Sequence, residues 1–211
     1  MRRAVILIPL LLLPGCGLVE HYLGDGTPSP VRIAVAWRAP TIDGHRVRRV
    51  VVLPFRDDTV HPESADGAQH ALIDALNRRQ PFEVVALDRS VFTARDEELW
   101  STTGRVKKDT ILRLSRRYHA DGVLYGTVTR FRPYEPMTFG LRIALVSTGA
   151  GDLIWEANAL YDAQDARVAQ DVHHWYDTQQ ADSHQLESWR SVLMSPTRFI
   201  GYACARIVET W

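Results

Sequence analysis

The sequence has little cysteine and no excess of charge, and each shortage excludes a class of protein. Its 211 residues include 2 cysteines, and its 25 basic residues are balanced by 25 acidic ones. Two cysteines are too few for a disulfide-stapled fold, and a chain of this length buries enough apolar surface to need no staple. Zero net charge argues against a nucleic-acid binder, which needs a cationic surface. A hydrophobic content of 45% excludes an intrinsically disordered chain.

The sequence also lacks the short motifs of common catalytic and nucleotide sites. It contains no G-x-G-x-x-G, Walker, G-x-S-x-G, H-E-x-x-H or C-x-x-C pattern. Ser115 lies near Arg116 and His119, but no acidic residue is within sequence reach of it. We therefore expect no enzyme, no cofactor and no bound metal.

One predicted helix, over 165–176, carries most of the residues that could bind a metal. Asp171, His174 and Asp177 are spaced three apart and could share a helix face, with Asp165 as a further ligand. His173 and His174 are adjacent and point about 100° apart, so both cannot bind one ion without distortion. A solvated outer face is the commoner use of such residues, and it is the interpretation that we favour.

Two further polar clusters are interpreted as surface. Asp57 and Asp58 follow a predicted buried strand, at a position where α/β sheets often carry sites, but they lack the D-x-D spacing of aspartyl phosphotransferases. A basic helical surface at Arg113, Arg116 and Arg117 is either a solvated face or a contact for anionic lipid or glycan.

Aromatic residues in a polar helical region form the candidate interface. Trp175, Tyr176 and Trp189 either pack in the core or anchor a partner. Trp211 ends the chain as in some outer-membrane barrels, but the residues before it have helical spacing, which argues against that interpretation. Cys204 lies in an apolar helical stretch and is predicted to be a buried small hydrophobe.

The start of the chain has the pattern of an export signal. Two arginines precede the ten apolar residues Ala4–Leu13, which as a helix would rise about 15 Å, half of a bilayer core of about 30 Å. Residues 1–15 are therefore predicted to be a signal peptide and not a spanning helix.

The tetrapeptide Leu13–Cys16 resembles the lipobox of bacterial lipoproteins. That resemblance implies a diacylglycerol on the Cys16 sulfur, cleavage between Gly15 and Cys16, and acylation of the new amine, for example with palmitate. Two or more acyl chains anchor a protein stably. Gly17, in place of an aspartate, resembles sorting to the outer membrane of a two-membrane bacterium.

The mature chain reads as a tether followed by one layered α/β domain. Glycines and prolines mark residues 16–30 as the tether, and 31–211 as a single domain. We expect a mixed sheet of about five to six strands flanked by helices, with a C-terminal helix. The predicted strands are 31–37 at an edge, 47–55, 82–87, 122–131, 137–146 and 153–161; the predicted helices are 63–79, 106–119, 165–176 and a last one from Ser195.

Finer patterns add three expectations. Val47–Phe55 is a continuous strand buried on both faces, ended by Pro54. Residues 88–105 are irregular, with at most one helical turn around Glu97. In the strand 122–131 the alternation puts the following residues on one face: Val123, Tyr125, Thr127, Thr129 and Phe131.

Several stretches in order resemble one superfamily of bacterial envelope proteins. The stretches are 50–55, 83–89, 120–129 and 141–155, and they are similar to the curli-secretion channel (CsgG-like) lipoproteins, the lipoprotein activators of peptidoglycan synthases and the N-terminal domain of the Tol–Pal translocation protein. The resemblance spans about 47–163. Its motif residues are Pro54, Phe55, Asp121, Gly122, Gly126 and Gly149, the last in a hairpin whose glycines supply positive φ angles.

The resemblance implies a protein that assembles or binds envelope partners and is not an enzyme. The curli channel also inserts long amphipathic hairpins into the outer membrane. Charged residues at alternate positions here, such as Arg142 and Glu156, fit a half-exposed soluble sheet better than lipid-facing strands. We expect a lipid-anchored periplasmic partner-binding module or homo-oligomer; the alternatives are a secretion-channel subunit and, third, an envelope hydrolase that uses Asp171 or His174.

Overall fold

The computed structural model describes residues 34–40, 47–179 and 188–211. The predicted signal peptide, the lipidation site at Cys16 and the tether lie outside the described residues and stay predictions. The strands are β1 (Ala34–Arg38), β2 (Arg49–Val52), β3 (Arg56–Asp57), β4 (Glu83–Ala86), β5 (Gly122–Arg132), β6 (Thr138–Ser147) and β7 (Leu153–Asp162). The helices are α1 (Glu63–Arg79), α2 (Ala94–Thr103), α3 (Lys108–Tyr118), α4 (Ala166–Gln179), α5 (Arg190–Met194) and α6 (Pro196–Val208), with a 3-10 turn at Arg89–Val91.

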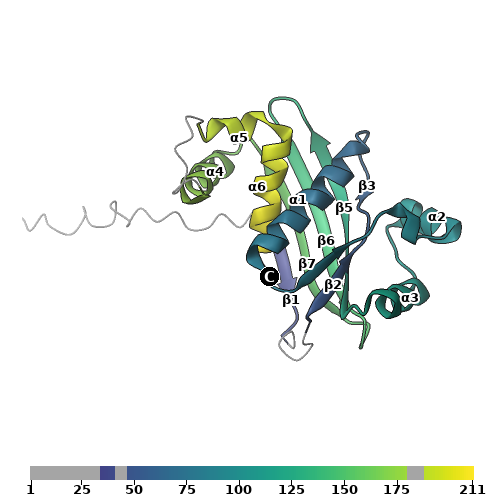
Figure 1. Cartoon of the computed structure of the whole chain (residues 1–211). Coiled ribbons are helices and arrows are strands. Elements are labelled where there is room, and N and C mark those ends of the chain that lie inside the picture. The colour runs from purple at the N-terminus through teal and green to yellow at the C-terminus, as the bar shows by residue number, and fades with distance from the viewer. Residues whose placement is uncertain (1–33, 41–46, 180–187) are drawn as a thin grey trace, which may run out of the picture. The chain divides into compact units, whose positions relative to one another are not determined.

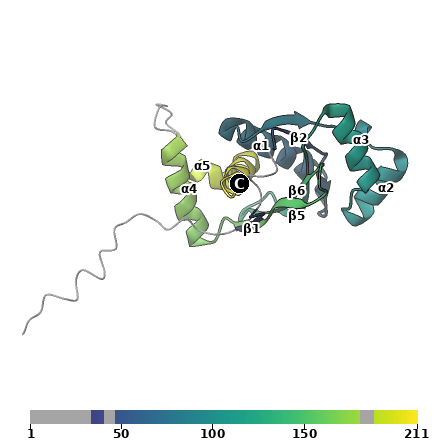
Figure 2. The same ribbon diagram turned by 90° about the horizontal axis from the view of Figure 1, so that it is seen from below.

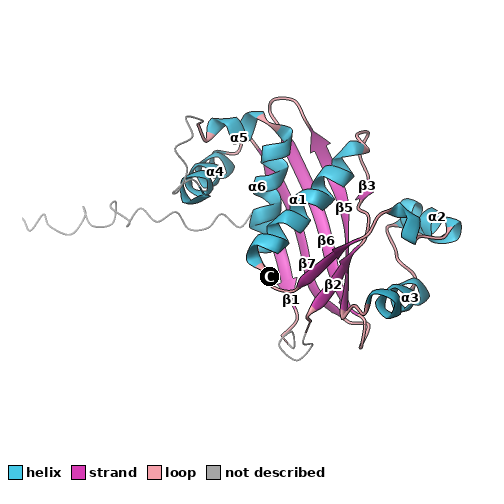
Figure 3. Ribbon diagram, viewed as in Figure 1, coloured by secondary structure: helices cyan, strands magenta, loops and turns pink. Residues whose placement is uncertain are grey.

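All the described strands join one mixed sheet, as expected. The order is β1-β7-β6-β5-β2-β4, and β3 pairs with β5 (Figure 3). The strands β2, β4 and β5 run parallel, whereas β5, β6, β7 and β1 are antiparallel. The sheet has seven strands and not five or six, because a two-residue strand, β3, follows β2 just beyond the predicted strand 47–55.

The break between β2 and β3 contains Pro54. Val52 pairs with Leu124 and Arg56 pairs with Thr127, so one strand advances four residues while the other advances three. Proline has no N–H to donate to a ladder, and the extra residue lets the chain pass it. Burial on both faces is confirmed, because Val50 and Val52 enter one hydrophobic cluster while Val51 and Leu53 enter the other.

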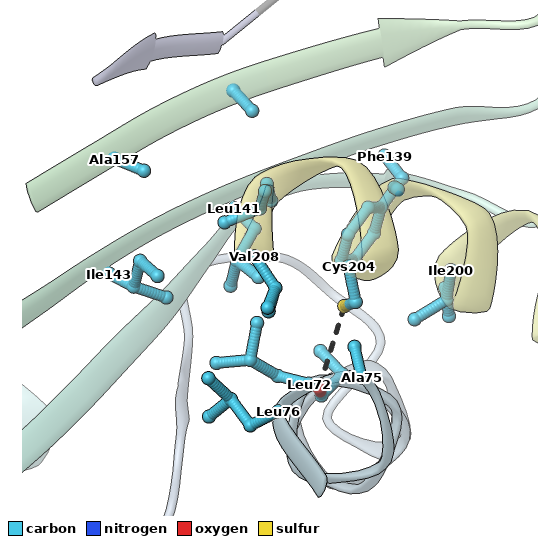
Figure 4. Packing of buried hydrophobic residues seen from close by; sticks show 14 of the residues in the cluster. Leu72, Ala75, Leu76, Phe139, Leu141, Ile143, Ala157, Ile200, Cys204 and Val208 are labelled. Atoms are coloured by element: carbon cyan, nitrogen blue, oxygen red, sulfur yellow. Dashed lines mark hydrogen bonds between the residues drawn. The ribbon is translucent and has the colours of Figure 1, made fainter. Parts of the chain in front are cut away.

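Helices cover the two faces of the sheet unequally (Figures 1 and 2). Helices α1 and α6 lie over one face, and their apolar residues pack on β6 (Figure 4). On the opposite face α3 contacts only β2 and β5 closely, with α2 beside it. None of the described helices is long and apolar enough to cross a membrane.

A bulge in β5 corrects the predicted alternation. The register between β5 and β6 shifts between Val128 and Arg130. Val123 and Tyr125 therefore belong to the cluster under α3, whereas Phe131 packs on the cluster under α1 and α6. Side chains alternate between the two faces of a strand, so one extra residue moves every later side chain to the opposite face. The predicted alternation assumed a strand without a bulge, and it is therefore wrong for the residues after Val128.

The segment 88–105 is more regular than predicted, since it contains the ten-residue helix α2. Thr93 accepts from the backbone of Asp96, and Asp96 accepts from the Thr93 backbone, which forms a capping box. The helix ends at Gly104, whose φ of 65° is left-handed. The sequence carried a signal for this helix: Thr93 with an acidic residue three positions on, and a glycine eleven positions after the threonine.

The hairpin after β6 uses one glycine for its positive φ and not two. Gly151 has a φ of 78°, whereas Gly149 is not among the described residues with positive φ. The helix expected over 63–79 is confirmed at those bounds, and the C-terminal helix is confirmed as α6.

Candidate interaction surface

The outward side of β6, β7 and β1 is left uncovered by the described helices (Figure 2). Alternate residues of these strands point to the helix-covered core, as Ile143 and Ala157 do. Their neighbours along the strands form the opposite side. We call that side the open sheet face, and its members are Val35, Trp37, Arg142, Glu156, Asn158 and Leu160.

Cross-strand pairing places these residues side by side. Asn158 lies opposite Val35 on one flank and Arg142 on the other. Glu156 lies opposite Trp37, and Leu160 is two residues along β7 from Asn158. The open sheet face therefore has apolar residues toward the edge of the sheet and two opposite charges, Arg142 and Glu156, farther in.

The apolar residues of this face are unusually exposed. Val35, Trp37 and Leu160 are 81%, 46% and 50% exposed. In β1 the large apolar side chains Val35 and Trp37 lie on the open side, whereas Ala34 and Ala36 lie on the side of the helices. This reverses the usual arrangement of a half-buried strand, and neighbouring exposed apolar residues are typical of interaction sites.

The two charges of the open sheet face lie close to one tyrosine. Burial raises the pKa of Tyr125, the Glu156 carboxylate raises it further, and the Arg142 guanidinium lowers it. Neither charge forms an ion pair with another described residue. A cation and an anion are thus held on one face without a partner among the described residues.

Val35, Trp37 and Leu160 were not predicted to form a surface. Their signal in the sequence is the alternation of β1, a segment predicted only as a short edge strand. Alternation shows which residues share a side of a strand, but only the neighbouring strands and helices determine which side is covered.

The residues weighed as a metal cluster do not come together, and the favoured interpretation of a solvated outer face is wrong for Asp171. Asp171 is buried, and its carboxylate accepts from Tyr202 Oη at 2.6 Å and from Arg206 Nε and Nη2 at 2.8 and 2.7 Å. It therefore ties α4 to α6. Burial raises the pKa of Tyr202, and the hydrogen bond that its hydroxyl donates to Asp171 raises it further.

The other residues weighed as metal ligands have partners or surroundings different from those of Asp171. His173 pairs with Asp177 at 3.7 Å and packs edge-on against Trp189, and both of the pair are exposed. His174 is exposed, and Asp165 pairs with Arg167. Among the described residues no group of three or more histidine, cysteine, aspartate or glutamate side chains could hold a metal ion.

The three aromatic residues of the predicted interface pack at the edge of the core. Trp175 lies edge-on to Tyr202, with 5.5 Å between the ring centroids, and Tyr176 is half-buried. Trp189 carries Arg190 over its ring and lines an open pocket of about 570 Å³ with Met194. Only Trp189 of the three lines this pocket.

Four of the motif residues of the family resemblance, Phe55, Asp121, Gly122 and Gly126, have structural roles in the packing and pairing of the strands. Phe55 covers Gly126, where a Cβ would lie 2.9 Å from the ring. Asp121 accepts from the backbone N–H groups of Arg48 and Arg49, which fastens β2 to the turn before β5. At Gly122 a Cβ would lie 3.0 Å from Leu145, so both glycines permit close packing.

The remaining polar candidates have structural partners. Asp57 accepts from Ser64 and from the Thr59 backbone at the start of α1, and Asp58 pairs with Arg56 at 2.5 Å. Ser115 donates to the carbonyl of Ala120. Arg113 binds Asp96 and the carbonyl of Val91, so it belongs to a clamp between α2 and α3.

Cys204 is fully buried against α1, and its thiol lies 3.7 Å from the carbonyl of Ala68 (Figure 4). Burial raises the pKa of this thiol far above its ordinary value. In a Cys16→Ser variant, where Cys204 is the one remaining thiol, we expect iodoacetamide at pH 8 to react at least about tenfold more slowly than in urea-unfolded protein. Equal rates in the two states, measured by mass spectrometry, would contradict the burial.

No family model matches the chain, and no curated protein matches it. Among solved structures the chain is similar to a PelC dodecamer from Paraburkholderia phytofirmans, with 15% identity, a TM-score of 0.46 and coverage of 65% of this chain and 87% of that one. It is similar to lipoprotein GNA1162 from Neisseria meningitidis, with 19% identity, a TM-score of 0.39 and coverage of 65% and 99%. It is also similar to the LpoB C-terminal domain from Escherichia coli, with 15% identity, a TM-score of 0.38 and coverage of 58% and 93%. At these identities and TM-scores the likenesses do not assign the chain to a family.

Proposed function

We propose that this chain is a lipid-anchored envelope protein that acts as a non-enzymatic partner-binding or assembly module. In this proposal Cys16 carries the lipid, the anchor lies in the outer membrane and the α/β domain faces the periplasm. The observation that carries the binding role is the open sheet face, where Val35, Trp37 and Leu160 remain exposed beside Arg142 and Glu156.

Tethering is the mechanism that we propose for such a module. A protein held by its lipid stays near the membrane, so its effective concentration toward membrane-associated partners is high even when each contact is weak. The exposed tryptophan supplies the kind of side chain that dominates binding energy at protein interfaces. The module therefore acts by placing partners next to one another and not by turnover.

The binding role is tested by cross-linking in cells. A photo-activated amino acid in place of Trp37 is expected to cross-link to envelope proteins that mass spectrometry identifies. The control places the same amino acid at Val60, which is 88% exposed and lies in the loop before α1. Products at both positions alike, or at neither, would contradict a binding role for this face.

The anchor is tested at Cys16. A Cys16→Ser variant cannot carry a thioether-linked lipid, so we expect it to move from the membrane fraction to the soluble fraction of lysed cells. A Cys204→Ser variant, which changes the other cysteine, should remain with the membranes. Retention of Cys16→Ser in the membrane fraction at the wild-type level would refute the anchor.

A further inference from the structure

We propose that the open sheet face binds a second copy of this chain, in a two-fold arrangement that sets Arg142 of each copy against Glu156 of the other. This inference rests on the proposed function, because it names the partner of the same face. It adds the residues that select that partner.

The charge pattern of the face is the first step. Arg142 on β6 and Glu156 on β7 are diagonal neighbours, because Arg142 lies opposite Asn158 and Glu156 lies opposite Ala144. A two-fold axis parallel to the sheet, running between the two residues, brings each of them over its opposite in the other copy. A face with one cation and one adjacent anion is therefore complementary to itself, which a two-fold interface requires.

The charges are also available for this contact. Neither Arg142 nor Glu156 forms an ion pair with another described residue, and Arg142 is exposed. By contrast, Arg113, Arg167 and Arg206 each have a carboxylate partner within the chain. The open sheet face thus keeps two opposite charges that form no ion pair within the described part of the chain, although both are close enough to act on Tyr125.

The apolar residues provide the second step. Val35, Trp37 and Leu160 lie on the same face as the charges, and a second sheet packed on it would take their exposed area out of water. Two twisted sheets pack face to face at about 10 Å, which is close enough for side chains of both to interdigitate. A second copy provides such a sheet with the same complementary charges.

The size of the face sets the expected strength. Strands β6 and β7 pair at nine positions, which corresponds to about 30 Å, and the three strands β6, β7 and β1 together span about 14 Å. A face of about 400 Å² lies below the roughly 800 Å² per partner of standard interfaces. We therefore expect a dimer that dissociates on dilution in solution and that the membrane anchor favours by concentrating the copies.

Charge reversal tests the inference on the full-length protein extracted in detergent. Sedimentation velocity over a concentration series gives the dimer dissociation constant for the wild type, Arg142→Glu and Glu156→Arg. Each reversal puts like charges together twice in a two-fold dimer, so we expect each to raise the constant at least about tenfold. An equimolar mixture of the two variants restores both opposite-charge contacts, so it should return to within about threefold of the wild type.

The matched control reverses an arginine elsewhere. Arg116→Glu changes the charge by the same amount on the exposed side of α3 and should leave the constant unchanged. A monomeric wild type at all concentrations, equal effects of Arg142→Glu and Arg116→Glu, or a mixture that fails to recover would each overturn the second-copy inference. A monomeric wild type that still cross-links through position 37 to a different envelope protein would overturn this inference and leave the proposed function standing.

Discussion

Replacing Asp171 with alanine is expected to lower the free energy of unfolding by about 3 kcal/mol. The carboxylate is buried between α4 and α6, where it accepts from Tyr202 Oη and from two nitrogens of Arg206. Its removal leaves a tyrosine hydroxyl and a half-buried guanidinium without their main partner. Arg206 keeps its ion pair with Glu209 at 2.8 Å. The expected loss of unfolding free energy is therefore at the lower end of the range for breaking a buried ion pair.

Urea unfolding followed by circular dichroism measures this loss, and Asp177→Ala on the same helix is the control. Asp177 is exposed, and among the described residues it pairs only with His173, at 3.7 Å, so its removal should change the free energy of unfolding by less than about 0.5 kcal/mol. If both variants unfold at the same urea concentration as the wild type, Asp171 does not tie the two helices together.

Gly126→Ala is expected to cost about 2 kcal/mol, although it adds one methyl group. An alanine Cβ at this position would lie 2.9 to 3.0 Å from three ring atoms of Phe55. Phe55 is fully buried in the main cluster and β5 is paired on both sides, so neither can move away without breaking other contacts. Overpacking of this kind forces shifts in the surrounding core.

Two companion variants separate this steric effect from the general effect of alanine. Gly201→Ala lies inside α6 with no atom within 4 Å of the new Cβ, so we expect it to stabilise the protein by about 0.5–1 kcal/mol. Phe55→Leu should cost less in the Gly126→Ala background than alone, because the smaller side chain makes room for the methyl group. Strictly additive losses would show that Gly126 and Phe55 do not conflict.

Local periodicity was sufficient for much of the fold. The helix 63–79 was predicted at its observed bounds because its apolar spacing is regular and Pro81 stops it. The strand predicted over 137–146 is observed as β6 (Thr138–Ser147), and its alternate residues Phe139, Leu141, Ile143 and Leu145 all reach the core. Both elements are long and uninterrupted, and in such segments the pattern of burial follows directly from the repeat.

The rest depended on contacts between distant segments. The bulge after Val128 and the break at Pro54 are settled by how neighbouring strands align, which a single strand does not reveal. Asp171 looked like a surface ligand because its partners Tyr202 and Arg206 lie more than thirty residues away. The open sheet face could not be predicted from the strands alone, because the helices determine which side of the sheet is covered.

Tension from the N-terminal side of the chain reaches this domain at an edge strand of the sheet. Strand β1 is the first described element after residue 33, it is five residues long, and it bonds to the sheet only through β7. Tension that arrives along the chain from its N-terminal side therefore acts on β1 before any other part of the sheet. The strands β5 and β6 lie inside the sheet and have a neighbour on each side. A small force would therefore separate β1 from β7 while the remaining sheet keeps its shape.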